Sequence, residues 1–445
     1  MADVLLVNYD NGSHIAQPPH GLAYLASALV NAGHNVDVWD AGVTHEPADK
    51  LREHINATKP SVVAASVIGG YWQHAQLLAL SKAVNASQHR DRLWYVIGGH
   101  GPASAPEYFR KVTGADTVFS GEGEVTFPAL CSAKDRPQFA HGETVDVDAV
   151  AWPAWDLFDM SVYRLQRYPK TLPTDFAMPV LSGRGCTYKC SFCFRHVPGF
   201  RARQPAAVAD EIAWLQSAHN MTYVNFDDEL LMSGPKRTRD LCEAIGPLGI
   251  RWMCNGRLDV AAKHPDLLPL MRDAGATFIN YGVESLSQPV LDAMNKRLTV
   301  EQIHAGVRAT LDAGLSPGLN VMWGCPNDTV ESLRMLVGFL REYDDGAQIR
   351  SIRPVTPYPG SPLFDLAVRE GRIKDAEDFY VRHVNSDLAS VQWTGLDDDA
   401  FHSALYDANA DLVEYGCERI EADRKRQLSK LYHERDASWR GFRHT

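Results

Sequence analysis

The stretch that decides the fold is Gly183-Arg184-Gly185-Cys186-Thr187-Tyr188-Lys189-Cys190-Ser191-Phe192-Cys193, in which three cysteines follow the spacing CxxxCxxC. Three thiolates on one short loop need a distant fourth ligand to complete a structural zinc site. They can instead bind three irons of a four-iron cluster and leave the fourth iron open for another molecule. Gly183 and Gly185 allow the backbone to fold closely around such a cluster. The spacing therefore favours an iron–sulfur cluster, with structural zinc as the alternative.

The surrounding sequence alternates between strand and helix patterns from Pro179 to about Pro362. Six short apolar stretches predict strands, at residues 180–182, 223–226, 252–254, 278–282, 318–323 and 350–354. Each of the first five is followed by a helical pattern. Six such units predict a partial (β/α)6 barrel, whose functional site would lie at the C-terminal ends of the strands. The cysteine loop follows the first strand, so we expect it at the mouth of this barrel.

The complete motif, with Phe192 as the aromatic residue before the last cysteine, resembles that of the radical S-adenosylmethionine (SAM) superfamily. Further matches extend the resemblance over residues 180–365, at Gly282-Val283-Glu284-Ser285, Met294-Asn295-Lys296, Gly324-Cys325-Pro326-Asn327-Asp328-Thr329 and Pro357-Tyr358-Pro359-Gly360-Ser361-Pro362. The resemblance implies a [4Fe–4S] cluster on Cys186, Cys190 and Cys193. It also implies reductive cleavage of SAM to a 5′-deoxyadenosyl radical, which abstracts hydrogen from a substrate.

Each polar group of SAM needs a partner at a strand end of this barrel. The second strand ends in Phe226 and is followed by three acids, where many members of the family have GGE. We expect one of these acids to accept the amine of SAM; they are Asp227, Asp228 and Glu229. Arg257 is the candidate cation for the SAM carboxylate. Phe192 would lie near the adenine.

Two further pairs of residues are candidates at the fourth strand and its neighbours. Glu284 and Ser285 end the fourth strand, and we expect them to bind the ribose hydroxyls of SAM. We expect Tyr223 and Tyr281 at strand ends of the barrel, where either phenol is a candidate catalytic group that donates a proton or hydrogen bond to the substrate. The alternative for both tyrosines is a place in the apolar core.

The first 130 residues show a second alternating series of strands and helices, which predicts a Rossmann-like, doubly wound parallel sheet. Ligands of such sheets bind at the carboxyl ends of the strands. The region resembles the cobalamin-binding-type domain that precedes the radical SAM barrel in one large subclass. The resemblance rests on Pro19-His20-Gly21-Leu22-Ala23-Tyr24-Leu25, Gly98-Gly99-His100 and Gly121-Glu122-Gly123-Glu124. The expected domains are residues 1–133, a linker over 134–178, the barrel over 179–365 and a C-terminal helical region over 366–445.

The sequence leaves open whether the first domain binds cobalamin. A slot for the nucleotide tail of cobalamin needs small residues, which are present as Ser66, Gly69, Gly70, Gly98 and Gly99. No Asp-x-His-x-x-Gly element is present, so a histidine ligand on the lower face of the corrin is not indicated. Two bulky rings, Tyr71 and Trp72, follow the slot and would fill it unless they fold into the core.

Two reactions of different classes fit these features. In the first, which we prefer, hydrogen abstraction from an aminosugar leads to loss of a neighbouring hydroxyl. This reaction resembles that of the radical SAM diol dehydratases of aminoglycoside deoxygenation, which are lyases of antibiotic biosynthesis. In the second, methylcobalamin donates a methyl group to a substrate radical, as in the natural-product methyltransferases of this subclass. A non-enzymatic iron–sulfur protein would leave the acids at three strand ends without a function.

The composition narrows the class of partner. Lys and Arg number 44 against 55 Asp and Glu, giving a formal charge of −11. This balance argues against nucleic acid as a partner and favours a neutral or cationic small molecule, such as an amine-bearing sugar. An electron donor such as flavodoxin or ferredoxin is also expected, with a partner reductase as a further possibility for completing the product.

The length and hydropathy define the broad class. The 445 residues, 45% hydrophobic and 22% charged, are typical of a soluble globular protein of two or three domains. No apolar run reaches the length of a membrane span. The N-terminal sequence reads as a strand rather than a signal peptide. We therefore expect a cytoplasmic protein without a membrane partner, in which the other five cysteines are buried thiols.

Overall fold

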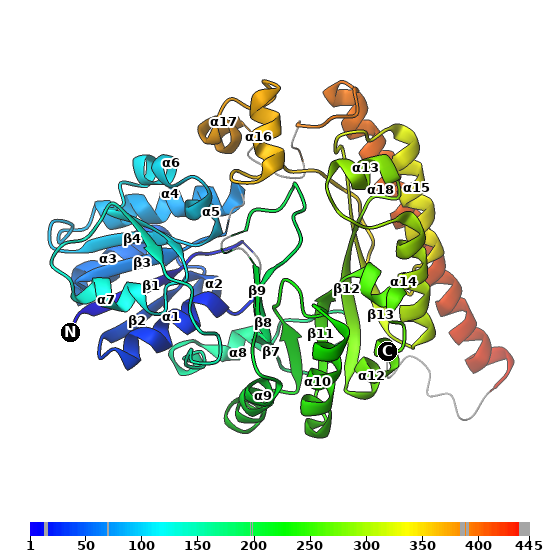
Figure 1. The fold of residues 1–445 in the computed structure, drawn as a ribbon, viewed down its shortest axis with the longest axis horizontal. Helices are drawn as coiled ribbons and strands as arrows, with labels where there is room; N and C mark the ends of the chain where they lie inside the picture. Colours follow the sequence, from blue (N-terminus) through cyan, green and yellow to red (C-terminus); the bar gives the residue numbers. More distant parts are fainter. Residues whose placement is uncertain are drawn as a thin grey trace.

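The computed structural model describes residues 1–12, 17–68, 71–195, 197, 199–382, 388 and 391–435, with only the backbone at 71, 72 and 431. Within these residues, the chain forms two parallel sheets of six strands each and a separate two-stranded antiparallel hairpin. Figure 1 shows the first sheet with its helices beside the second sheet, which is curled and has its helices on the outside. The mixed α/β class and the doubly wound first sheet are as the sequence predicts.

The first sheet has the strand order β2-β1-β3-β4-β5-β6, and all neighbouring strands are parallel. Its strands are β1 (Asp3–Asn8), β2 (Asn35–Asp40), β3 (Val62–Ser66), β4 (Trp94–Gly98), β5 (Thr117–Gly121) and β6 (Phe139–Gly142). The central strands are apolar without interruption because helices cover both faces of the sheet.

Alternate residues of β1 separate the two faces of this sheet. Leu6 packs with α1 (His20–Asn31) and α7 (Thr126–Ser132). Val7 belongs to a second core that includes Leu51, Leu77 and Phe109. The helices of that face are α3 (Ala48–Thr58), α4 (Tyr71–Asn85) and α6 (Pro106–Thr113), and the short helices are α2 (Ala41–Thr44) and α5 (His100–Ser104).

The expected linker over residues 134–178 is more structured than the sequence predicts. Its β6 pairs with β5 and completes the first sheet, and Ala177 begins the first strand of the second sheet. The segment also contains a 3-10 turn (Trp155–Leu157) and α8 (Met160–Tyr163). The sequence pattern did not reveal β6 because the strand has only four residues, Phe-Ala-His-Gly. Its large apolar side chain, Phe139, is exposed, and the buried positions hold Ala140 and Gly142.

The second sheet is a half-barrel with the strand order β14-β13-β12-β11-β10-β7, again parallel throughout. Its strands are β7 (Ala177–Val180), β10 (Tyr223–Phe226), β11 (Arg251–Gly256), β12 (Ala276–Glu284), β13 (Ser316–Trp323) and β14 (Arg353–Pro354). The predicted sixth strand begins three residues late. The reason is that the backbone of Ile352 bonds the side chain of Asn409 from the C-terminal helix instead of β13.

Helices enclose the outer face of the half-barrel (Figure 1). They are α9 (Pro205–His219), α10 (Pro235–Ile245), α11 (Leu258–Lys263), α12 (Leu267–Asp273), α13 (Gln288–Ala293), α14 (Val300–Asp312) and α15 (Val330–Glu342), with a 3-10 turn at Gly246–Leu248. Thr299 and Thr329 begin α14 and α15 with capping boxes, in which side chain and backbone satisfy each other's free hydrogen-bonding groups.

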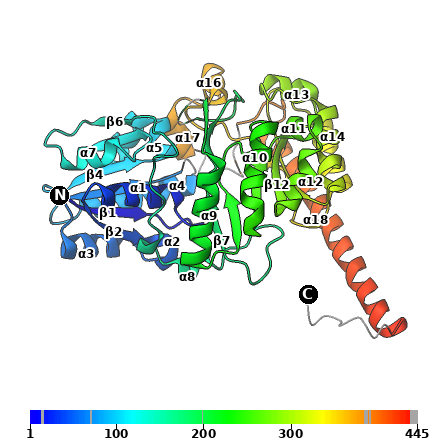
Figure 2. The ribbon, with the colours of Figure 1, turned by 60° about the horizontal axis from the view of Figure 1, so that its bottom comes forward.

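The C-terminal region has two parts. Helices α16 (Pro362–Arg369) and α17 (Ala376–Arg382) pack on the first domain, because Ala367, Phe379 and Tyr380 share its second core. Helix α18 (Asp398–Leu428) packs against α15 and then extends away from the body, as Figure 2 shows, ending in a π-helical turn at Ser429–His433. None of the helices among the described residues combines the length and the apolar character that a bilayer span requires.

Candidate functional site

The cysteine motif lies on a hairpin at the carboxyl end of β7. Strands β8 (Gly183–Cys186) and β9 (Gly199–Ala202) are antiparallel, and Cys186 faces Gly199 in the register. A Cβ on Gly185, which has φ +86°, would lie 2.2 Å from the carbonyl oxygen of Gly199. Only glycine therefore allows the two strands to approach this closely beside the first cysteine.

The three cysteines lie on one loop and differ in burial: Cys190 is buried, Cys186 is half-buried and Cys193 is exposed. Hydrogen bonds hold the loop between two distant segments, from Ser191 N to the Met294 carbonyl (2.9 Å) and from Leu363 N to the Ser191 carbonyl (2.8 Å). In the described part of the chain, no three His, Cys, Asp or Glu side chains converge on a single ion.

Arg257 supports the same loop. Its guanidinium lies 3.4 Å from the ring centroid of Tyr188, and its Nε donates to Asp259 at 2.8 Å. Tyr188 donates its hydroxyl to the other oxygen of Asp259 at 3.1 Å, and Arg257 also donates to the Lys296 carbonyl. The predicted SAM-carboxylate ligand is therefore already paired, and its observed contacts orient the cysteine loop.

The three consecutive acids after β10 have different surroundings. Asp228 is fully buried and accepts hydrogen bonds from the backbone N–H of Ser182 (2.8 Å) and from its hydroxyl (2.7 Å). Burial raises the pKa of Asp228 to about 6, although these hydrogen bonds oppose the shift. Asp228 thus fixes the residue that leads into the cysteine hairpin and is not available to SAM.

Of the other two acids, Asp227 faces the first domain and Glu229 lies on the side of the cysteine loop. Asp227 contacts Nδ1 of His20 in the first domain at 3.3 Å and accepts a hydrogen bond from Asn225 at 2.8 Å. Glu229 is exposed by its accessible surface, yet partial loss of hydration raises the pKa of its carboxyl, and the charge of Arg195 opposes that shift. Burial also raises the pKa of the Cys186 thiol, and the negative charge of Glu229 adds to this effect. The charge of Glu229 therefore acts on the Cys186 thiol.

Glu284 ends β12 in a left-handed backbone conformation, with φ +65°. Its Oε1 accepts a hydrogen bond from Lys296 Nζ at 2.7 Å, and both side chains are buried. A Cβ on Gly282 would lie 2.3 Å from that oxygen, so this glycine makes room for the pair. Ser285 is fully buried, and its hydroxyl accepts a hydrogen bond from Ser287 N, which makes it a turn residue rather than a ligand.

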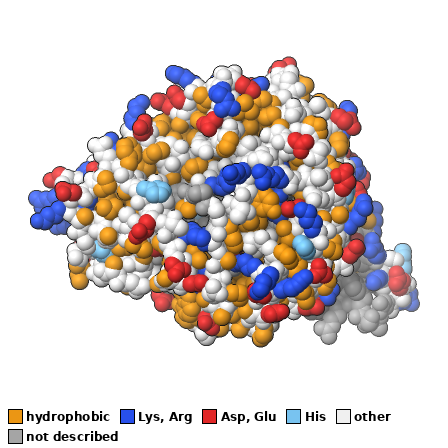
Figure 3. Space-filling view, viewed as in Figure 1, with side chains coloured by type: hydrophobic (Ala, Val, Ile, Leu, Met, Phe, Trp, Pro, Cys, Tyr) orange, Lys and Arg blue, Asp and Glu red, His pale blue; other side chains and the backbone are white. Residues whose placement is uncertain are grey.

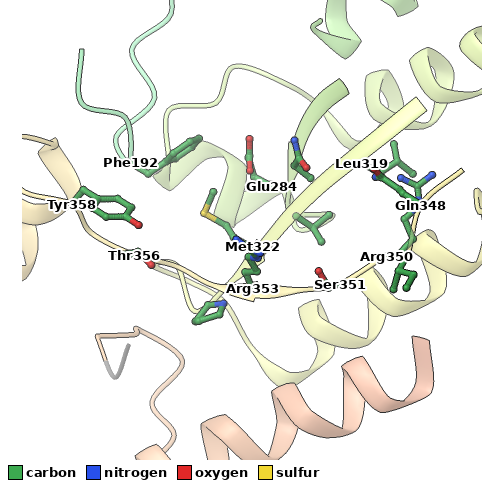
Figure 4. A pocket seen from close by; sticks show the side chains of 14 residues that line it. Phe192, Glu284, Leu319, Met322, Gln348, Arg350, Ser351, Arg353, Thr356 and Tyr358 are labelled. Atoms are coloured by element: carbon green, nitrogen blue, oxygen red, sulfur yellow. The ribbon is translucent and has the colours of Figure 1, made fainter. Parts of the chain in front are cut away.

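A cavity of about 590 Å³ extends from the cysteine loop along the inner face of the half-barrel. Figure 4 shows Phe192 and Tyr358 at one end, Glu284 and Met322 in the middle, and Gln348 and Arg350 at the other end. Lys296 Nζ lies 5.6 Å from the ring centroid of Phe192, within cation–π range. Phe192 and Glu284 therefore share one cavity, as the sequence predicts.

The two candidate catalytic tyrosines lie away from this cavity. Tyr223 is the first residue of β10, so it lies at the amino end of the strand, where it packs with Ala177, Met253 and Phe278 and bonds Thr277. Tyr281 is fully buried, and its hydroxyl bonds Thr310 of α14. Both are core aromatics, and their positions do not fit contact with a substrate at the mouth.

Two adjoining cavities lie at the carboxyl ends of the first-sheet strands, with volumes of about 390 Å³ and 850 Å³. Both are lined by residues of the first domain and by Asp227 of the barrel, and the residues that they share include His20, Gly21, Ser66 and Gly99. The smaller one is walled by small residues, which include Ala64, Ala65, Gly98, Gly121 and Gly123. Two of the expected slot residues, Gly69 and Gly70, and the side chains of Tyr71 and Trp72 lie outside the described residues.

A cluster of ion pairs joins the two domains at this point, and the sequence did not reveal it. Arg184 donates to Glu122 (3.2 Å) and Glu124 (2.6 Å), and Arg201 donates to both oxygens of Glu122 (2.6 and 2.9 Å). Burial would raise the pKa of Glu122, but hydrogen bonds from Arg201, Val145 and Arg184 lower it below its usual value. The one feature of the sequence that could have indicated this cluster is the charged residue Arg184 between two glycines of the cysteine motif.

His20 was also missed as a residue of the domain interface. Its ring is 8% exposed and lies 4.9 Å from the ring of Tyr24 and 5.7 Å from that of Trp155, measured between centroids. It begins α1 and meets Asp227 of the barrel across the interface. The segment Pro19-His20-Gly21 was noted in the sequence, but nothing local indicates a contact 207 residues away.

Two protein families match this chain, one over the barrel and one over the first domain. Residues 180–340 match the Radical SAM superfamily, and residues 16–131 match the B12 binding domain family. The class that the fold and the cysteine site define is therefore the radical SAM enzymes, which use a [4Fe–4S] cluster and SAM. The chain thus has a radical SAM domain that is preceded by a B12-binding domain.

Curated relatives are similar over most of this chain. An anaerobic magnesium-protoporphyrin IX monomethyl ester cyclase of Rubrivivax gelatinosus is 27% identical over 83% of this chain and 70% of its own length. An uncharacterized methyltransferase of Pyrococcus horikoshii is 25% identical, covering 79% and 78%. The hopanoid C-2 methylase of Rhodopseudomonas palustris is 24% identical, covering 80% of this chain and 65% of its own.

Solved structures share the arrangement of the whole chain. The radical SAM methyltransferase TsrM of Kitasatospora setae, with cobalamin and a [4Fe–4S] cluster bound, superposes with a TM-score of 0.69 at 17% identity, covering 93% of this chain and 89% of its own. The cobalamin-dependent radical SAM enzyme OxsB superposes with a TM-score of 0.64 at 18% identity, covering 92% and 62%. These likenesses confirm the fold.

The comparisons also correct the expected reaction. The preferred reading, a diol dehydratase that deoxygenates an aminoglycoside, is wrong, because the relatives are methyltransferases and cyclases. An aminosugar substrate and a lyase activity likewise find no support among them. The error came from the net charge, which is a property of the whole surface. Figure 3 shows side chains of both signs spread over one face of the molecule.

Proposed function

We propose that this protein is a cobalamin-dependent radical SAM enzyme that transfers a methyl group to carbon. The observation that carries the proposal is the glycine- and alanine-walled cavity at the carboxyl edge of the first sheet, which faces the cysteine hairpin of the barrel. Arg184 and Asp227 of the barrel line this cavity together with residues of the first domain. A cofactor held there would lie against the mouth of the barrel.

The first-domain cavity fits the nucleotide tail of cobalamin. Gly99 has φ +92°, and a Cβ there would lie 2.5 Å from the Val67 carbonyl oxygen. Gly21 faces open space, with no atom within 4 Å of its Cβ position, and lines both adjoining cavities. Backbone without side chains allows a flat or elongated ligand to approach the strand ends closely. The larger cavity next to it has room for part of the corrin.

The cysteine loop fits a [4Fe–4S] cluster with one open iron. Cys186, Cys190 and Cys193 supply three thiolates, and no fourth cysteine of the described residues belongs to the loop. Arg257, Tyr188 and Asp259 hold the loop in place from the β11 side.

The surroundings of the loop fit SAM. We assign the amine of SAM to Glu229, whose charge acts on the Cys186 thiol, and its ribose hydroxyls to Glu284. Lys296 occupies one carboxylate oxygen of Glu284 and leaves the other to accept hydrogen bonds. Phe192 and Tyr358 offer aromatic faces for the adenine at the same end of the cavity.

When bound, the cluster, SAM and cobalamin would together supply a carbon-centred radical and a methyl group. The chain's own residues orient these groups and exclude water from the space between the domains. Asp228 fixes the start of the cysteine hairpin, Arg257 supports its loop at Tyr188, and the Glu122 ion pairs fix its contact with the first domain. No described residue at the mouth is required to act as an acid or base in a hydrogen abstraction.

The proposal is tested on the anaerobically reconstituted protein with SAM, reductant and hydroxocobalamin. A methyltransferase that uses SAM both as radical source and as methyl donor releases 5′-deoxyadenosine and S-adenosylhomocysteine, and its product gains the mass of one methylene group. Hydroxocobalamin should remain with the protein through gel filtration, which its absorption spectrum reports. Release of 5′-deoxyadenosine alone, with no retained corrin, would contradict methyl transfer.

A ring-closing reaction is the second candidate, because the magnesium-protoporphyrin ester cyclase of Rubrivivax gelatinosus is similar over 83% of this chain. The same incubation separates the two reactions. A cyclase would release 5′-deoxyadenosine without S-adenosylhomocysteine, and the mass of its product would not increase by a methylene group. Both reactions share the cluster and SAM sites, so the distinction depends on the product.

A further inference from the structure

The hairpin that carries the cysteine motif has two arginines directly opposite each other. Arg184 of β8 pairs with Arg201 of β9 in the antiparallel register, one residue position from the pair of Gly185 with Phe200. Like charges that face each other across two strands destabilise the pairing. This hairpin therefore needs a negative charge between the two guanidinium groups.

The first domain supplies that charge. Glu122 accepts hydrogen bonds from both arginines, at 3.2 Å from Arg184 and at 2.6 and 2.9 Å from Arg201. Glu124 accepts a further one from Arg184 at 2.6 Å. Glu122 is 8% exposed, so these charges are shielded from water and interact strongly.

The loop that carries these acids packs closely against β6. Gly121 has φ +77°, and a Cβ on it would lie 2.5 Å from the Gly142 carbonyl oxygen. A Cβ on Gly142 would lie 1.7 Å from the Glu122 carbonyl oxygen. The remaining oxygen contact of Glu122 is the backbone N–H of Val145, at 2.8 Å. A displacement of this loop would therefore move the carboxylate that holds the hairpin.

The same loop lines the cavity assigned to the cobalamin tail. Glu122, Gly123, Glu124 and Arg184 all belong to the wall of the 390 Å³ cavity. A molecule bound there contacts the acids on one side, while the arginines of the hairpin hold them on the other. The binding of that molecule and the position of Cys186, which ends β8, thus depend on one ion-pair cluster.

We infer that Glu122 is a positioning residue that couples occupancy of the first-domain cavity to the geometry of the cysteine hairpin. This inference rests on the proposed function, because it takes cobalamin as the molecule in the cavity. Coupling between two binding sites is reciprocal, so a filled cluster site should change the affinity for cobalamin by the same factor as cobalamin changes cluster binding.

The test measures the dissociation constant of hydroxocobalamin by absorbance, on protein with and without a reconstituted cluster. For the unmodified protein we expect the two constants to differ by about five-fold or more, the usual range of coupling between sites. In Glu122→Gln, which keeps the shape and removes the charge, the ratio should fall to one. The electron paramagnetic resonance spectrum of the reduced cluster should respond to hydroxocobalamin in the unmodified protein and not in the variant.

The matched control is Asp116→Asn, which removes a bidentate pair with Arg90 (2.9 and 3.0 Å) in the same domain and outside both cavities. It should retain the full ratio. If Glu122→Gln does not fold, Arg201→Lys keeps the charge but removes the two-pronged hydrogen bond and should lower the ratio.

The outcomes separate the two proposals. A ratio of one in the unmodified protein, or an unchanged ratio in Glu122→Gln, overturns the coupling and leaves the proposed function intact. Failure of the unmodified protein to bind hydroxocobalamin overturns both, since the cavity would then have another ligand. Loss of coupling in the Asp116→Asn control would also overturn the assignment to Glu122.

Discussion

Asp227, Asp228 and Glu229 are neighbours in the sequence, yet their side chains have three different partners. Asp227 meets His20 of the first domain, Asp228 holds Ser182, and Glu229 lies beside Cys186. The strand β10 ends at Phe226, so the chain turns through these residues and each points in its own direction. A single motif therefore serves the domain interface, the hairpin and the candidate SAM site.

Replacement of Glu229 by Gln should weaken SAM binding about ten-fold or more, because a hydrogen bond to a charged group contributes about 1.5–3 kcal/mol. Cluster content should not change, since Glu229 does not ligate iron. Equilibrium dialysis of SAM with the reconstituted protein measures this. Asp227→Asn is the matched comparison and should bind SAM normally; the assignment is wrong if Asp227→Asn has the larger effect.

Replacement of Cys190 by Ala should abolish the release of 5′-deoxyadenosine and lower the iron and sulfide content of the reconstituted protein. The matched control is Cys242→Ala, another buried cysteine, which lies on α10 away from the loop. It should retain cluster and activity. Persistent 5′-deoxyadenosine release in Cys190→Ala would refute the cluster assignment.

At the scale of elements, an aromatic cluster joins the first domain to the C-terminal region. His74 of α4 is 8% exposed, stacks on Tyr380 of α17 at 4.6 Å between ring centroids, and bonds the Tyr108 hydroxyl at 2.9 Å. Burial lowers the pKa of His74 from 6.5 to about 4. The folded protein therefore favours the neutral ring more strongly than the unfolded chain does.

The lowered pKa of His74 makes the free energy of unfolding depend on pH. Because the folded pKa of His74 lies below the unfolded value of 6.5, its contribution is complete above pH 6.5 and is lost as the pH falls toward about 4. The maximum loss is about 3 kcal/mol. His74→Phe should make the free energy of unfolding less sensitive to pH between 6.5 and 4. Denaturant titrations across this range check it, and an unchanged slope would contradict it.

At the scale of the whole molecule, the two sheets place their carboxyl ends against a common interface. The first-domain cavities contain Asp227 from the barrel, and the cysteine hairpin is held by Glu122 and Glu124 from the first domain. Each domain therefore supplies residues to the other's site. An isolated barrel would lack the acids that neutralise Arg184 and Arg201 of its own hairpin.

Gly21 offers a test of the interface cavities that does not strain the backbone. Leucine there has open space around its Cβ, is favoured over glycine in a helix, and would occupy part of both cavities. Hydroxocobalamin at 100 times its dissociation constant should stabilise the unmodified protein by about 2.7 kcal/mol. Thermal unfolding should show this stabilisation in Gly21→Ala but little of it in Gly21→Leu. Equal stabilisation in both variants would place cobalamin elsewhere.

The sequence predicted the repeating parts of this fold well. Alternation of strand and helix patterns is a local property, and four of the six barrel strands contain the predicted apolar stretches. The first strand, Ala177–Val180, shares only Val180 with the predicted range 180–182. The short strands were the exceptions. In β14, the partner of Ile352 is Asn409, a side chain 57 residues away, and the sequence contains no local trace of that contact.

By itself, the sequence determined the cysteine loop, the alternating α/β order and the resemblance to radical SAM enzymes, because spacing and periodicity are readable from neighbouring residues. Only the tertiary structure decided which acid faces which site, and that Tyr223 and Tyr281 belong to the core. It also brought together His20 with Asp227, and Glu122 with two arginines. Such contacts join residues that are 60 to more than 200 positions apart, and they depend on how the two sheets pack rather than on any local pattern.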